Sequence, residues 1–263
     1  MKRIGLVALI LTCMIASCAG SREKSRQQAE ASRRLAGAYI GQGNYTLALR
    51  ELLKAEQVFA DDPFLQSDLG YVYMQKNSLD LSVKHYKKAL KLKPDFPSAR
   101  NNLGTVYLKR GEWDAAIACF KPLTENLVYM TPQKPLVNLG WAYYNKKEFQ
   151  LSEKYYQDAL IFYREGLAKD TTYIMALRGL SLTYMAIEKY SDAVANLEQA
   201  VKDADGVPRL LPRLHFDLGE AYTLAHDFNK ARQAYRKVIE LAPESDLARK
   251  AKREVQKIEN LRQ

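Results

Sequence analysis

The chain has 263 residues, with 40 basic and 30 acidic side chains and therefore a formal net charge of +10. These basic residues are scattered along the chain instead of forming one stripe, which argues against a nucleic-acid-binding protein. Only three cysteines are present, and one of them lies in a segment expected to be removed, so no disulfide framework is expected.

The chain begins with the pattern of an export signal. Two basic residues precede an apolar run at 4–15, which is too short to span a bilayer comfortably. The tetrapeptide Ile-Ala-Ser-Cys that ends at Cys18 resembles the lipobox of bacterial lipoproteins. This resemblance implies a signal peptide over residues 1–17 and a lipidated Cys18 as the first residue of the mature protein. An ordinary secretory signal and a short membrane anchor are the alternatives.

A polar segment at 18–29 follows, and we interpret it as a lipidated tether grading into the first helix. Its basic side chains either rest on anionic head groups or belong to a solvated linker. Ala19 follows the cysteine, where lipoproteins of the enteric type that stay in the inner membrane have Asp. The resemblance therefore implies an outer-membrane location, with the protein facing the periplasm.

A tyrosine then recurs six times, and five further positions recur around it. The six anchor tyrosines are spaced by 34, 34, 36, 41 and 38 residues and are Tyr39, Tyr73, Tyr107, Tyr143, Tyr184 and Tyr222. Relative to each anchor, a leucine lies at −4 and a small residue at −3. A large apolar residue lies at +6, a small residue at +9 and another large apolar or aromatic residue at +13.

These positions have a physical meaning. The leucine and the tyrosine share one face of a first helix, because they are four residues apart. The small residues allow a second helix to approach closely, and the +13 side chain fills the seam between the two. Gly43 and Gly111 lie where the first helix must stop, in the position that favours a left-handed glycine.

The pattern resembles the tetratricopeptide repeat, in which helix pairs of about 34 residues stack on one another. The resemblance covers residues 30–243 and implies an all-α, right-handed superhelix, a solenoid of six helix pairs. We expect these pairs at 30–59, 63–93, 97–126, 133–169, 173–204 and 208–241. The segment 244–263 has apolar residues every three or four positions among charged ones and is interpreted as a capping helix.

No combination of residues points to catalysis. The three histidines are separated, none pairs with a cysteine at metal-ligand spacing, and no glycine-rich phosphate loop or nucleophile elbow is present. We therefore expect no enzyme activity, metal, cofactor or small-molecule substrate. His85 is expected at the surface. A repeat-fused enzyme is disfavoured, because signal, tether, repeats and cap account for all 263 residues.

The remaining function is recognition of a protein partner. In a right-handed stack, the first helices line the concave face, and their inward positions are rich in aromatic residues and methionine. The predicted partner-binding groove comprises Phe64, Tyr71, Met74, Asn101, Leu108, Val137, Trp141, Tyr144, Arg178 and Met185. The alternative is that some of these side chains pack inside a tight superhelix or against a second copy.

Three segments suggest a narrower family. Residues 100–108 (RNNLGTVYL), 126–132 (NLVYMTP) and 138–144 (NLGWAYY), within a six-repeat lipoprotein, resemble the PilF/PilW/Tgl family of type IV pilus biogenesis proteins. Members of this family are outer-membrane lipoproteins called pilotins, and the resemblance implies assistance to the multimerisation of the secretin. The alternative is an adaptor in β-barrel outer-membrane assembly, or one that docks envelope proteases or hydrolases.

Overall fold

The computed structural model of the chain describes residues 23–125, 131–164 and 169–260, and every regular element in these ranges is a helix. The chain divides into two compact units, up to Glu112 and from Trp113 onward, and each is described by itself. No described helix combines the length and the apolar character that a bilayer crossing requires. Cys18 and most of the segment 126–132 lie outside the described residues.

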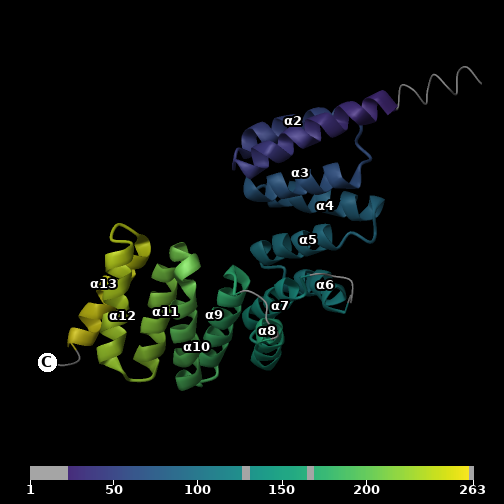
Figure 1. Cartoon of the computed structure of the whole chain (residues 1–263). Coiled ribbons are helices and arrows are strands. Elements are labelled where there is room, and N and C mark those ends of the chain that lie inside the picture. Colours follow the sequence, from purple (N-terminus) through teal and green to yellow (C-terminus); the bar gives the residue numbers. More distant parts are fainter. Residues whose placement is uncertain (1–22, 126–130, 165–168, 261–263) are drawn as a thin grey trace, which may run out of the picture. The chain divides into compact units, whose positions relative to one another are not determined.

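The first unit consists of helices that follow one another as antiparallel neighbours. After a helix over residues 23–41 come α2 (Tyr45–Val58), α3 (Pro63–Gln75), α4 (Leu79–Leu92) and α5 (Pro97–Arg110). Within this unit, α2 packs against α3, α3 against α4 and α4 against α5, as Figure 1 shows for the purple and blue helices. The first helix, α2 and α3 share one buried hydrophobic core. Its residues include Ala36, Ala48, Leu52, Leu65, Leu69 and Val72.

The first helix begins earlier than the sequence led us to expect. Residues 23–29 were interpreted as tether, but they are helical. Ala29 is buried against the core, and Arg26 forms an ion pair with Glu30 one turn later at 3.0 Å. Burial of one side of this turn and pairing along the other explain why the polar segment is helical.

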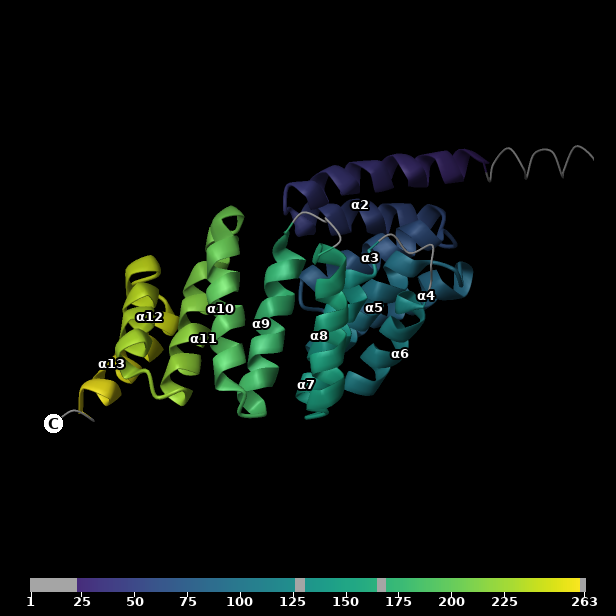
Figure 2. The same ribbon diagram turned by 60° about the horizontal axis from the view of Figure 1, so that its bottom comes forward.

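The second unit continues the same arrangement. Its helices are α6 (Trp113–Thr124), α7 (Gln133–Asn145), α8 (Phe149–Arg164), α9 (Thr171–Ala186), α10 (Tyr190–Lys202), α11 (Leu211–Leu224), α12 (Phe228–Leu241) and α13 (Asp246–Asn260). Each helix packs against its successor, and α9 to α13 lie side by side in both Figure 1 and Figure 2. Two short 3₁₀ turns, Asp203–Gly206 and Pro208–Leu210, connect α10 to α11.

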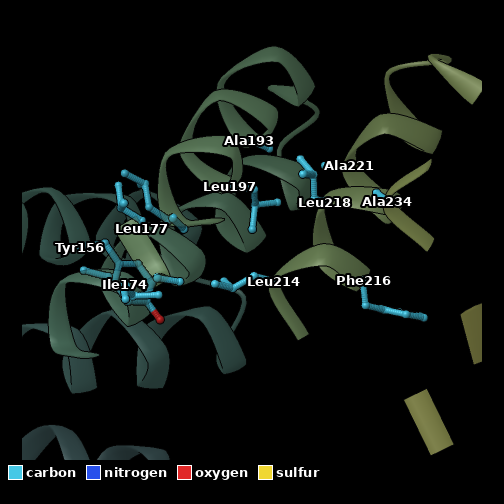
Figure 3. Close-up of a cluster of buried hydrophobic side chains, with 14 of the residues drawn as sticks. Tyr156, Ile174, Leu177, Ala193, Leu197, Leu214, Phe216, Leu218, Ala221 and Ala234 are labelled. Atoms are coloured by element: carbon cyan, nitrogen blue, oxygen red, sulfur yellow. The ribbon is translucent and has the colours of Figure 1, made fainter. Parts of the chain in front are cut away.

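One continuous core runs through the second unit from α7 to α13. Figure 3 shows part of it: Tyr156 of α8 lies beside Ile174 and Leu177 of α9, and Leu197 of α10 lies beyond them. The α13 helix closes this core by burying Ala248, Ala251 and Ile258, and most of its exposed residues are charged. That is the role expected of a capping helix, because it covers apolar surface and presents a polar face to water.

The turn inside each pair follows the anchor tyrosines closely. All six second helices begin at the +6 residue: Tyr45, Leu79, Trp113, Phe149, Tyr190 and Phe228. The residue at +4 has a positive φ in every repeat: Gly43, Asn77, Gly111, Lys147, Glu188 and His226, with φ between 60° and 73°. The chain therefore uses a left-handed residue to end each first helix, as the glycines at two of these positions predicted.

The seam between paired helices is equally regular. All six +13 side chains are almost completely buried: Leu52, Tyr86, Phe120, Tyr156, Leu197 and Tyr235. A methyl group added at Gly70, Gly140 or Gly219 would lie only 2.6–2.9 Å from the ring of the +13 tyrosine of the same repeat. Glycine at −3 is thus required for the aromatic seam, which confirms the interpretation of the small-residue position.

Two details differ between repeats. Where serine replaces alanine at +9, its hydroxyl donates to the carbonyl of the −3 glycine, as Ser82 does to Gly70 at 2.7 Å and Ser152 to Gly140 at 2.9 Å. The −4 leucine is buried in five repeats, but Leu35 is 45% exposed. In the described part of the chain, no helix precedes that of Leu35.

Candidate functional site

The ten predicted groove residues divide equally between the two units. In the first unit, Phe64 is 43% exposed and Met74 is buried, whereas Tyr71, Asn101 and Leu108 are half-buried. In the second unit, Val137 is buried, and Trp141, Tyr144, Arg178 and Met185 are half-buried. Met74 and Val137 consequently offer a partner little surface, and the assignment of the other eight stays a prediction.

Phe64 belongs to an exposed aromatic and basic cluster at the start of α3. Its ring meets that of Phe96 edge to face, with ring centroids 5.2 Å apart. The Lys93 ammonium lies 4.9 Å from the Phe64 centroid, and the Arg33 guanidinium lies 5.5 Å from it. Arg33 also lies 3.4 Å from the Asp68 carboxylate, and burial raises the pKa of that carboxyl to about 6.

In the second unit, the predicted residues from α7 lie together. Trp141 and Tyr144 are three residues apart on one helix face, and their rings stack with centroids 5.5 Å apart and planes inclined by 13°. The ring of Tyr144 also lies near that of Phe149, the first residue of α8, with ring centroids 5.9 Å apart. The stack presents two large amphipathic side chains on a first helix, the type of group that anchors protein interfaces.

A cavity of about 470 Å³ opens beside this stack, and we call it the α7–α13 pocket. Two predicted residues, Tyr144 and Met185, line it. The other lining residues are Leu182, Ala186, Glu220, Thr223, Leu224, Tyr235 and Glu254. The pocket therefore unites the first helices of three successive repeats with the capping helix, which contributes a side chain to the cavity in addition to covering the core.

Arg178 is placed by a buried ion cluster. Its Nε lies 2.5 Å from Oδ2 of Asp217, which is completely buried in α11. The Nε of Arg213, one turn before Asp217, lies 2.8 Å from Oδ1. Removing Arg178 would leave the buried Asp217 with Arg213 as its one ion-pair partner among the described residues and would break the link between two helices, so we assign Arg178 chiefly to fixing α9 against α11. Sequence reasoning missed Asp217, because nothing in a helical pattern marks a buried carboxylate.

Two groups beside the pocket have perturbed acid–base properties. Burial raises the pKa of Glu220, and the neighbouring carboxylate of Asp217 raises it further. Burial also raises the pKa of the Tyr144 hydroxyl, so that this group is a neutral hydrogen-bonding group at physiological pH. The pocket thus combines apolar walls with acidic and hydroxyl groups.

A second, larger cavity of about 820 Å³ lies among α8, α9 and α10. Its floor contains Leu160, Leu177 and Leu180, and three tyrosines, Tyr163, Tyr173 and Tyr184, take part in its walls. None of the predicted groove residues lines it. Burial raises the pKa of all three tyrosines, so their hydroxyls remain protonated.

His85 is not at the surface, contrary to expectation. It is 6% exposed, and its Nδ1 lies 2.7 Å from Oε1 of the buried Gln66. The Gln66 amide nitrogen donates to Glu56 and to the Ala60 carbonyl, both at 2.9 Å. The histidine therefore joins α4 to α3. Within the described ranges, no group of three or more His, Cys, Asp or Glu side chains is arranged to hold a metal ion.

Comparison with known proteins identifies the repeats. Models of the TPR repeat match residues 70–111, and models of the tetratricopeptide repeat match 136–171 and 212–245. Each matched segment contains the anchor tyrosine of its repeat. Comparison with curated protein sequences gave no match.

Solved structures extend the likeness to most of the chain. The structure of PilW, a type IV pilus biogenesis factor, is similar to this chain with a TM-score of 0.75 and 18% sequence identity. The match covers 84% of this chain and 97% of PilW. PilF of Pseudomonas aeruginosa is similar with a TM-score of 0.69 and 17% sequence identity, and the match covers 89% of this chain and 99% of PilF. YrrB, a TPR protein with an unusual peptide-binding site, is similar with a TM-score of 0.52 and 18% sequence identity, and the match covers 77% of this chain and 97% of YrrB.

At these identities the likeness concerns the fold. The helix-pair seams, the left-handed turns and the matched repeat segments all agree with it. The chain contains tetratricopeptide repeats in the three matched segments and shares its fold with PilW and PilF.

Proposed function

We propose that this protein is a non-catalytic outer-membrane lipoprotein that assists the assembly of a type IV pilus secretin. The observation that carries the proposal is the fold likeness to PilW and PilF, which extends over 97% and 99% of those chains. Tetratricopeptide repeats typically present a surface to another polypeptide, and this fits the exposed aromatic and apolar side chains of the first helices.

The proposed membrane attachment depends on Cys18. The sequence around it resembles a lipobox, and a lipid-anchored protein facing the periplasm would meet secretin subunits on their way to the outer membrane. Several acyl chains hold a protein stably at a bilayer, whereas one holds it weakly. In this proposal, the anchor supplies location, and the first helices of the repeats supply recognition.

Deletion of the gene tests the partner. Secretin multimers withstand heating that dissociates most complexes, so they can be followed on a non-boiled gel. We expect the multimer band to disappear in the deletion strain while β-barrel outer-membrane proteins assemble normally. Loss of the barrel proteins with an unchanged secretin band would instead identify an adaptor for barrel assembly.

The groove is tested by removing the aromatic stack. Trp141→Ala combined with Tyr144→Ala should preserve helicity, because both side chains are only half-buried. It should reduce the amount of secretin multimer and the capture of secretin by the purified protein at least tenfold, as expected when interface anchors are lost. Ile161→Ala, an exposed change on α8, is the matched control and should behave as wild type. Unchanged capture by the double variant would reject the groove.

A further inference from the structure

The α7–α13 pocket has an unusual combination of walls. Leu182 and Met185 of α9 and Leu224 of α11 supply apolar surface, and Tyr144 supplies an aromatic ring. Glu220 of α11 and Glu254 of α13 line the same cavity. A purely apolar ligand would bury these carboxylates without compensation, which is costly, and an anionic ligand would be repelled by them.

The positive charges near the pocket already have carboxylate partners. Arg178 and Arg213 lie 2.5 and 2.8 Å from the two oxygens of the buried Asp217. Lys257 lies 2.8 Å from one oxygen of Glu254. Among the described residues, no cationic side chain lies within ion-pair distance of Glu220. The pocket therefore carries a half-buried negative charge that lacks a direct counter-ion.

Burial in the protein affects Glu220 in the way expected for such a group. Its pKa is raised by desolvation first and by the negative charge of Asp217 second, and the positive charges of Arg213 and Arg178 offset only part of this increase. A ligand cation placed beside Glu220 would offset both effects, because an opposite charge nearby favours the ionised carboxylate. In the free protein the charged form of Glu220 is thus disfavoured, and a cationic group bound in the pocket would stabilise it.

We propose that the α7–α13 pocket binds a lysine or arginine side chain of the protein partner, with its aliphatic stem against Leu182 and Met185 and its charge between Glu220 and Glu254. Long basic side chains match these walls, since they are apolar along the stem and charged only at the tip. This inference rests on the proposed function in that it names the chemistry of the partner segment. A volume of about 470 Å³ is ample for one such side chain.

Matched peptides test the proposal directly. The probes are Ac-Ala-Leu-Arg-Leu-Ala-NH₂ and the same peptide with citrulline, the neutral isostere of arginine, at its centre. Binding to the mature protein is followed by tryptophan fluorescence, to which Trp113 and Trp141 both contribute, and by calorimetry. We expect the arginine peptide to bind about tenfold more tightly than the citrulline peptide, and this preference to shrink as salt screens the charges.

Variants assign the preference to the two carboxylates. Glu220→Gln combined with Glu254→Gln keeps the shape of the pocket and should abolish the difference between the two peptides. Glu188→Gln combined with Glu244→Gln is the control, because it changes the net charge by the same amount at exposed positions outside the pocket. This variant should still bind the arginine peptide more tightly than the citrulline peptide. Equal binding of both peptides to the wild type, or no saturable binding up to about 1 mM arginine peptide, overturns the proposal.

Secretin assembly separates this inference from the proposed function. If Trp141→Ala with Tyr144→Ala loses the secretin multimer while Glu220→Gln with Glu254→Gln retains it, the secretin role stands and the cationic pocket is rejected. If the gene deletion leaves the multimer intact while the arginine preference depends on both glutamates, the pocket stands and the secretin role is rejected. Loss of multimer in both variants supports the two together.

Discussion

At the scale of single residues, the +4 position after each anchor tyrosine combines one backbone geometry with several side chains. All six residues there have φ near +60° to +73°, and only Gly43 and Gly111 are glycines. A side chain in this conformation crowds the following carbonyl and costs roughly 1–2 kcal/mol. Lys147, Glu188 and His226 are held there by the turn between two packed helices, so their strain is compensated by neighbouring contacts.

Replacing one of these residues with glycine should stabilise the protein. Lys147 is exposed, and Lys147→Gly relieves the left-handed strain at the expense of a more flexible unfolded chain. We expect the free energy of unfolding to rise by about 0.5–1 kcal/mol in urea titrations followed by circular dichroism. Gln150→Gly, on the exposed face of α8, should instead lower it by about 1 kcal/mol. Equal destabilisation by both changes would contradict this view of the turn.

At the scale of helices, the anchor spacing predicted the pairs well because the same contacts recur. The +6 residue starts each second helix, and the −3 glycine with the +13 aromatic fixes the distance between partners. These contacts are local in sequence and can be read from spacing alone. The prediction failed where a contact depends on a distant or polar partner: the helical start at residue 23, the burial of His85 and the role of Asp217.

The α7–α13 pocket was only partly anticipated by the sequence. Two of the ten predicted groove residues, Tyr144 and Met185, line it, and their role in binding stays a prediction. Glu254 contributes from the capping helix, whose pattern of charges gave no sign of a site, and Tyr235 contributes from a seam position. Spacing identifies which face of a helix is inward, but it does not reveal which other helix brings a side chain to the same cavity.

The contact between α3 and α4 should make stability depend on pH. The Gln66 amide nitrogen donates to Glu56 and the Ala60 carbonyl, so its Oε1 accepts from Nδ1 of His85. Burial lowers the pKa of His85, with Lys84 and Lys88 acting in the same direction and Glu56 against it. The unfolded histidine titrates near 6.5, so the stability from neutral His85 is complete above about pH 6.5 and is lost as pH falls below it.

The test compares His85→Asn with the wild type between pH 7.5 and pH 5.5, a window on either side of about 6.5. Asparagine retains a donor close to the position of Nδ1 but does not titrate. We expect the urea midpoint of the wild type to fall more steeply with decreasing pH than that of the variant. Parallel slopes would show that burial of the His85 ring does not disfavour its protonated form.

At the scale of the whole molecule, the proposal combines an anchor with a repeat scaffold. Most described residues belong to helix pairs, and within the described ranges no group of side chains is arranged to hold a metal ion. In this proposal the protein holds its partner at the membrane, so membrane attachment and partner binding should depend on different residues. Location is assigned to Cys18 and binding to side chains from α7 onward, far along the sequence.

Cys18→Ser therefore should remove the location and leave the binding surface. We expect the variant to lose incorporation of radiolabelled palmitate and to leave the outer-membrane fraction, because the lipidated thiol is absent. The other two cysteines are natural controls: Cys13→Ser and Cys119→Ser should retain the label, since one lies in the proposed signal peptide and the other is buried in α6. Purified Cys18→Ser protein should still capture secretin, and Trp141→Ala with Tyr144→Ala should abolish that capture. Wild-type protein that is cleaved but carries no label would indicate an ordinary secretory signal, and the anchor would then have to be abandoned while the repeat surface remained testable.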